Sequence, residues 1–171
     1  MRQIPEMPDN DEILAQISRP GNQEDPAAAE ETEKYVIFDI DGRSFALPGA
    51  QVQEIVIDYE IFYLPFMPPY IRGLINRHGE PYTVIDLKIL FQQQPLDGKK
   101  FIIIRDAYDK LSLLITDILK IVNIKKSSIR PVTAQTTGSG YFLYTAAIDN
   151  ADIPVLHIDT VVKKIEIDVS R

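Results

Sequence analysis

The sequence predicts an all-β fold in which antiparallel strands form a barrel or a sandwich. From Tyr35 onward, short runs rich in Val, Ile, Tyr and Phe recur at close intervals, and most of them are too short for helices. An Asp-Gly pair at 41–42 separates two such runs and supplies the positive φ angles that a tight hairpin turn needs. The 171 residues, of which 45% are hydrophobic, suffice for one domain with a sizeable core.

The expected elements begin with a hairpin formed by residues 35–40 and 43–47. Further strands are expected at residues 52–57, 61–66, 73–76, 81–87, 101–106, 111–116, 118–124, 141–148 and 153–158. Helical patterns are sparse. Residues 86–91 favour a turn or two of helix, and residues 159–167 favour a terminal helix with Asp159 as its N-cap.

Residues 1–34 are expected to form a flexible acidic tail. They hold nine acidic and three basic residues together with four prolines, a composition too polar to offset the entropy lost on ordering. Within them, residues 9–18 begin with acids and place Ile13, Leu14 and Ile17 on one helical face. Two interpretations stay open: a transient helix in a disordered tail, or a short segment that docks in a groove of this chain or of a partner.

The net charge of −7 comes almost wholly from this tail, because the rest of the chain carries 16 acidic and 15 basic residues. A nearly neutral body lacks the basic stripe typical of nucleic-acid-binding proteins. The sequence also lacks a secretory signal and an apolar run near the roughly 20 residues that span a bilayer. The absence of cysteine fits a reducing compartment. We therefore expect a soluble cytoplasmic protein that binds no nucleic acid and does not insert into membranes.

No catalytic, metal-binding or cofactor-binding pattern is present. The glycine cluster at 136–141 lacks the context of a phosphate-binding loop, and a GxSxG motif is absent. The two histidines are 79 positions apart, and His157 is expected in a strand at the edge of the core. Asp86, Asp106 and Asp117 lie near strand ends without implying acid-base catalysis, and Asp86 is expected to anchor a backbone or arginine contact. We therefore expect that the protein is not an enzyme and that it binds neither a metal ion nor a cofactor.

A polar turn within residues 68–87 is the strongest candidate for a binding site. It places Arg72, Arg77 and His78 around two glycines and an asparagine, between two apolar runs. Binding residues often lie on such turns, and arginine is enriched at the energetic centres of interfaces. The alternative is that Arg72 and Arg77 are solvated loop charges, and the residues alone leave both interpretations open.

Two segments together form a recognisable signature. VQEI at 52–55 is followed, at 68–91, by PPYIRGLINRHGEPYTVIDLKILF. This segment looks like a P-x-x-[IV]-x-G-[VL]-x-N-x-R-G block that leads into a P-[IV]-[IV]-D-L strand, with His78 at the arginine position and VIDL at 84–87. Weaker likeness continues through IRP at 129–131 and covers residues 35–166. The chain thus resembles the CheW-like family, the coupling proteins of bacterial chemosensory arrays, with a CheW-like domain expected over residues 35–171.

This resemblance implies two five-stranded, SH3-like β-barrel subdomains packed around a shared hydrophobic core, with short helices and a C-terminal helix. It also implies a non-enzymatic adaptor that couples the cytoplasmic tip of a methyl-accepting chemoreceptor to the regulatory domain of the histidine kinase CheA. A divergent CheW-like module that serves another motility or type IV pilus pathway is the alternative. The residues that match the family's contact segments are Val52, Gln53, Glu54, Ile55, Tyr70, Ile71, Arg72, Gly73, Asn76, Arg77, His78 and Gly79.

The chain departs from the family pattern just before Gly79. Family members usually have an arginine there, whereas this chain has His78, with Arg77 one position earlier. Neighbours in a strand or turn face different ways, so Arg77 is not expected simply to substitute. His78 carries a charge only below about pH 6.5 unless its environment raises its pKa. A relaxed position in an ordinary adaptor and a divergent adaptor with changed contacts are both open.

Overall fold

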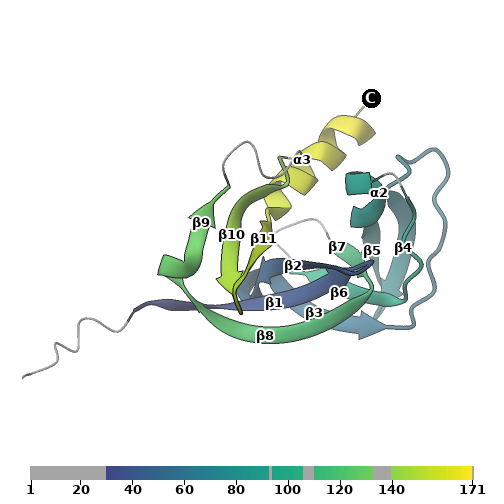
Figure 1. Ribbon diagram of the computed structural model, residues 1–171. Coiled ribbons are helices and arrows are strands. Elements are labelled where there is room, and N and C mark those ends of the chain that lie inside the picture. Colours follow the sequence, from purple (N-terminus) through teal and green to yellow (C-terminus); the bar gives the residue numbers. More distant parts are fainter. Residues whose placement is uncertain (1–29, 93, 106–109, 133–139, 171) are drawn as a thin grey trace, which may run out of the picture. The chain divides into compact units, whose positions relative to one another are not determined.

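The computed structural model describes residues 30–92, 94–105, 110–132 and 140–170. Their strands form two sheets, one of six strands in the order β8-β1-β2-β11-β10-β9 and one of five in the order β3-β6-β7-β5-β4 (Figure 1). The strands of the first sheet come from the two ends of the domain sequence, and those of the second sheet come from its middle. The predicted all-β class is confirmed, and the first sheet has a sixth strand because a short segment pairs with β10.

The six-stranded sheet contains β1 (Thr32–Ile40), β2 (Arg43–Pro48), β8 (Asp117–Lys125), β9 (Ile129–Pro131), β10 (Phe142–Ile148) and β11 (Ala151–Leu156). The five-stranded sheet contains β3 (Val52–Ile57), β4 (Ile71–Arg77), β5 (Glu80–Asp86), β6 (Lys100–Ile104) and β7 (Leu111–Ile115). The helical elements are α2 (Leu87–Gln92), α3 (Ile158–Val169) and the single 3-10 turns η2 (Gly49–Gln51) and η3 (Lys126–Ser128). The β2–β11 and β5–β7 pairs are parallel and the other described pairs are antiparallel.

The first hairpin forms as predicted. Asp41 and Gly42 have φ angles of 51° and 82°, the left-handed pair that this tight turn requires. The turn is fastened by two backbone donors: the N–H of Gly42 donates to Asp39 Oδ2 at 3.0 Å, and that of Asp41 donates to Thr116 Oγ1 at 2.8 Å. β1 starts earlier than expected because Thr32 already pairs with Lys125 of β8. Residues 32–34, assigned above to the tail, therefore lie in a strand.

Some sequence-based expectations fall outside the described residues. Residues 1–29, with the possible docking segment 9–18, are among them, so the flexible tail stays a prediction. Asp106 and most of the glycine cluster at 136–141 are also not described.

The strand expected at residues 61–66 is wrong. Only Phe62 makes a β-bridge, exchanging backbone hydrogen bonds of 2.7 and 2.9 Å with Leu74. Pro65 has no N–H to donate to a ladder, and the φ of 61° at Phe66 turns the chain out of extended geometry. This segment is therefore a loop that covers the free edge of β4.

The strand expected to include His157 ends one residue before it. The last β11 residue, Leu156, pairs with Phe142, and the N–H of His157 then donates to the carbonyl oxygen of Tyr141 at 2.8 Å. His157 occupies the N-cap position of α3, and its Nδ1 lies 2.9 Å from Thr160 Oγ1. Asp159 lies in the first turn of α3 instead of capping it, where its negative charge is favourable.

One hydrophobic cluster is shared by the two sheets. Phe38, Phe45 and Phe142 from the six-stranded sheet pack in the same cluster as Phe101 and Ile102 from the five-stranded sheet. The α2 and α3 helices add buried residues to it. A second cluster lies on the six-stranded sheet alone and comprises Tyr35, Ile37, Ala46, Ile124, Ala146, Ile148, Ile153 and Val155. The shared core that the resemblance implied is therefore present. Among the described helices, none is long and apolar enough to cross a membrane.

Candidate partner-binding site

The predicted contact residues lie on β3 and on or next to β4, the two edge strands of the five-stranded sheet. Glu54 of β3 and Arg77 of β4 bring the two sequence segments together. Arg77 Nε donates to Glu54 Oε2 at 2.9 Å, and Arg77 Nη2 contacts Glu54 Oε1. The two edges are thus linked by a forked ion pair between side chains, the geometry in which arginine binds a carboxylate most specifically.

This ion pair accounts for the shifted arginine. The Arg77 side chain is only 17% exposed, and its hydrogen bonds to the Glu54 carboxylate raise the pKa of Arg77. His78, at the position usual for arginine, has a φ of 53° and contacts Arg77 Nη1 through Nε2. In this chain the arginine that reaches Glu54 is therefore the one placed a residue early, whereas the imidazole lies exposed in the following turn.

Asn76 and Gly79 shape the turn between β4 and β5. The Asn76 Oδ1 atom accepts a hydrogen bond from the N–H of Gly79 at 2.9 Å. Gly79 has a φ of 82° directly after the positive φ of His78, as in a tight two-residue hairpin. The side-chain oxygen of Asn76 therefore fixes the turn, and Asn76 as a whole remains exposed.

Arg72 belongs to the framework and is not a solvated loop charge. Its Nη1 donates to Asp86 Oδ2 at 2.8 Å and to the carbonyl oxygen of Leu96 at 3.1 Å. Asp86, which is fully buried, also accepts backbone N–H bonds from Leu96 at 2.8 Å, Lys88 at 3.0 Å and Ile89 at 3.2 Å. The prediction that Asp86 anchors a backbone or arginine contact is confirmed, and both kinds of contact are present.

Tyr70, Ile71 and Gly73 are buried rather than presented at the surface. The Tyr70 hydroxyl donates to Asp168 Oδ2 of α3 at 2.9 Å, and burial raises the pKa of Tyr70. Gly73 has a φ of 137°, and a Cβ atom there would lie 2.2 Å from the carbonyl oxygen of Phe62. These residues position the strand and its neighbours.

Nine of the twelve predicted contact residues remain at least partly accessible. Gln53, Asn76, His78 and Gly79 are exposed, and Val52, Glu54, Ile55, Arg72 and Arg77 are partly exposed. Arg72 is already engaged with the buried Asp86. The remaining accessible residues lie on β3 and at the end of β4, on either side of the Glu54–Arg77 pair.

Sequence reasoning missed an exposed apolar loop between β3 and β4. We call residues 61–67 the aromatic loop. It exposes Phe62 by 52%, Tyr63 by 78%, Phe66 by 101% and Met67 by 39%. The prolines at 65, 68 and 69 were the available signal, since three prolines within five residues are incompatible with an interior strand.

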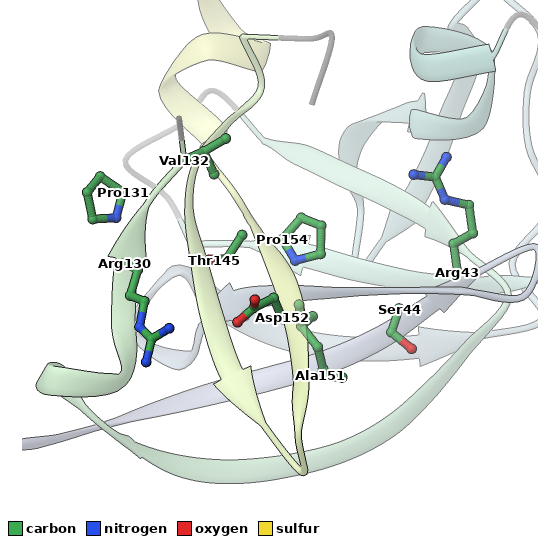
Figure 2. A pocket seen from close by; sticks show the side chains of 10 residues that line it. Arg43, Ser44, Arg130, Pro131, Val132, Thr145, Ala151, Asp152 and Pro154 are labelled. Carbon is green, nitrogen blue, oxygen red and sulfur yellow. The ribbon is translucent and has the colours of Figure 1, made fainter. Parts of the chain in front are cut away.

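A pocket of about 630 Å³ opens on the six-stranded sheet, away from the predicted site. Figure 2 shows Arg130 of β9, Thr145 of β10 and Asp152 of β11 along it, with Arg43 of β2 on another wall. Arg130 belongs to the IRP segment at 129–131. None of the twelve predicted contact residues lines this pocket. Within the described part of the chain, no group of three or more His, Cys, Asp and Glu side chains is arranged to hold a metal ion.

Comparison with known proteins gives consistent matches. The family model of the CheW-like domain matches residues 34–166. The chemotaxis protein CheW of Helicobacter pylori is 23% identical over 140 residues, which cover 79% of this chain and 84% of that protein. The crystal structure of the scaffolding protein TtCheW from Thermoanaerobacter tengcongensis superposes with a TM-score of 0.67 at 27% identity, covering 74% of this chain and 90% of that one. The chain therefore belongs to the CheW-like family of chemotaxis scaffold proteins, which are non-enzymatic adaptors.

Proposed function

We propose that this protein is a cytoplasmic chemosensory adaptor that couples methyl-accepting chemoreceptors to the histidine kinase CheA. Membership in the CheW-like family supports an adaptor role in chemotaxis. The observation that carries the proposal is the Glu54–Arg77 pair, because it joins the two signature segments, β3 and the β4–β5 turn, at one place on the five-stranded sheet.

The proposed receptor-contact surface consists of the accessible residues around that pair. Ile55 and Gln53 on β3 offer apolar area and a hydrogen-bonding side chain, and Asn76 and His78 at the end of β4 offer further hydrogen-bonding groups. An apolar centre with a polar rim is the usual anatomy of a reversible protein interface. Tyr70, Ile71, Arg72 and Gly73 act indirectly in this proposal, by holding β4 in place.

The proposal is tested by Ile55→Asp in the full-length protein. A charge at an interface centre cannot be desolvated without loss, so affinity for a purified receptor signalling-tip fragment should fall by about 2 kcal/mol, close to thirtyfold. Isothermal titration calorimetry measures this affinity. Leu119→Asp is the matched control, because Leu119 is an equally apolar residue, 52% exposed, on β8 of the other sheet.

The outcomes separate the parts of the proposal. Unchanged affinity for Ile55→Asp would remove this residue from the receptor-contact surface. If the wild-type protein binds neither the receptor fragment nor the purified CheA regulatory domain, the coupling function itself is wrong. Binding to components of another motility or pilus pathway would then support the divergent module.

A further inference from the structure

The aromatic loop gathers four large exposed apolar side chains in seven residues. Phe66 is 101% exposed, so its side chain is as accessible as in an extended peptide. Tyr63 and Met67, on either side of it, are 78% and 39% exposed. Contiguous exposed apolar side chains of this kind mark interaction sites, and aromatic residues and methionine are enriched in them.

The loop is anchored at its base. Phe62 exchanges two backbone hydrogen bonds with Leu74 of β4, and Gly73 lets the two backbones approach closely. Ile61 packs against the shared core. At the far end, the N–H of Ile71 donates to the carbonyl oxygen of Pro68 at 2.9 Å. A loop held at both ends and containing Pro65 loses little conformational entropy on binding, which favours affinity.

The loop also has a defined electrostatic setting. Residues 44–71 contain no lysine or arginine, and the acid just before the loop, Glu60, is exposed. The neighbouring acid Asp58 differs, because its N–H donates to the carbonyl oxygen of Lys99, so a cationic residue lies nearby. Residues 58–71 thus bring two acids and no lysine or arginine, a composition unsuited to an anionic membrane surface.

From these observations we infer that the aromatic loop is a preformed docking knob for a folded protein partner whose receiving surface is an apolar pocket bordered by a basic residue. A projecting ring requires a concave receiver, and Glu60 requires a cation opposite it. The inference rests on the proposed function and deepens it, because it adds a contact surface next to the one around Glu54 and Arg77.

The test uses the full-length protein and two purified probes, the CheA regulatory domain and a receptor signalling-tip fragment, each titrated by calorimetry. The double variant Tyr63→Ser/Phe66→Ser should bind at least one of the two probes about tenfold more weakly than the wild type, as expected when aromatic anchors are removed. Leu119→Ser combined with Ile121→Ser is the matched control, because these residues are 52% and 55% exposed on β8. The control should bind both probes as the wild type does.

A second variant tests the electrostatic part. Glu60→Lys should weaken binding to the same probe severalfold, and Glu60→Gln should weaken it less, because a reversed charge repels the basic border and a neutral one only loses attraction. Circular dichroism and urea unfolding must show that all variants fold as the wild type does.

The remaining outcomes overturn the inference. If the Tyr63/Phe66 variant binds both probes as tightly as the wild type, the loop is not their docking site and the adaptor function stands. If the substitutions change only self-association, measured by sedimentation, the occupant is a second copy of this chain. If the wild type binds neither probe, the proposed function fails and this inference fails with it.

Discussion

Arg77 and Glu54 join β4 to β3 through two contacts between guanidinium and carboxylate, although 23 residues separate them in sequence. The two strands are the opposite edges of the five-stranded sheet, so this pair closes the sheet where no backbone ladder does among the described strands. Because side chains make this link between β3 and β4, substitutions can break or strengthen it without changing the backbone pairing of the strands.

The first prediction concerns this closure. A double-mutant cycle with Glu54→Gln and Arg77→Gln should give a favourable coupling energy, measured by urea unfolding, that decreases as salt is added. The same cycle on Lys100 and Asp117, a more exposed pair between the first residues of β6 and β8, should give a smaller coupling. Equal coupling for the two pairs would contradict a special role for Glu54 and Arg77.

The second prediction concerns the buried carboxylate. Asp86→Ala removes the carboxylate partner of Arg72 and leaves three backbone N–H groups without their acceptor. We expect a loss of about 3 to 5 kcal/mol in the free energy of unfolding, as when one partner of a buried pair is deleted. Asp97→Ala, at an exposed position nearby, should change it by less than about 0.5 kcal/mol. A loss below about 1 kcal/mol for Asp86→Ala would show that water replaces the carboxylate.

The third prediction concerns the close approach of the aromatic loop to β4. In Gly73→Ala, the new Cβ would lie 2.2 Å from the carbonyl oxygen of Phe62, and the φ of 137° would also be strained. We expect a loss of about 2 to 4 kcal/mol in the free energy of unfolding. Amide hydrogen exchange should also show lost protection at Phe62 and Leu74.

The control for this variant is Gly140→Ala. A Cβ atom at Gly140 meets no atom within 4 Å, so its substitution should be nearly neutral. Unaltered protection at Phe62 in Gly73→Ala would mean that the hydrogen bonds between Phe62 and Leu74 persist and that the backbone accommodates the new Cβ at little cost.

The fourth prediction concerns alkaline pH. Burial, with a smaller contribution from Glu33, raises the pKa of Tyr35 to about 12, and burial also raises the pKa of Tyr70. In the unfolded chain both tyrosines titrate near pH 10. Above that pH the unfolded state releases these protons first, so it binds fewer protons than the native state and the free energy of unfolding falls.

This stabilisation is complete below about pH 10 and disappears as the pH rises toward 12. Urea unfolding at pH 9, 10 and 11 should show the decline, and Tyr35→Phe and Tyr70→Phe should each make it shallower. Tyr63→Phe, at a side chain 78% exposed, should leave the slope as in the wild type. If none of the three substitutions changes the slope of the free energy of unfolding against pH, groups other than these tyrosines cause the decline.

The parts of the fold that depend on local chemistry could be predicted from the sequence. Asp41-Gly42 specifies its own turn, and the Val- and Ile-rich runs specify strands because each buries a face. The sequence did not reveal that Phe62 would meet Leu74, because that contact depends on where β4 lies. The apolar alternation around His157 likewise extended the predicted strand past the residue where its pairing ends.

The candidate site was predicted in part. The signature segments located β3 and β4, and the departure at 77 and 78 was visible in the sequence. The engagement of both arginines depends on partners that are distant in sequence, since Arg72 donates to Asp86 and Leu96 and Arg77 donates to Glu54. The family pattern alone could not separate residues that face outward from residues that support them. The twelve contact residues remain a prediction.

The insertion of β11 between β2 and β10 has a consequence for biosynthesis. β2 emerges from the ribosome early, yet its parallel neighbour lies more than 100 positions later, at Ala151–Leu156. The middle of the chain, β3 to β7, can pair while translation continues, whereas the six-stranded sheet stays open until β11 has been made. A stalled or truncated product would leave one side of β2 unpaired and prone to aggregate.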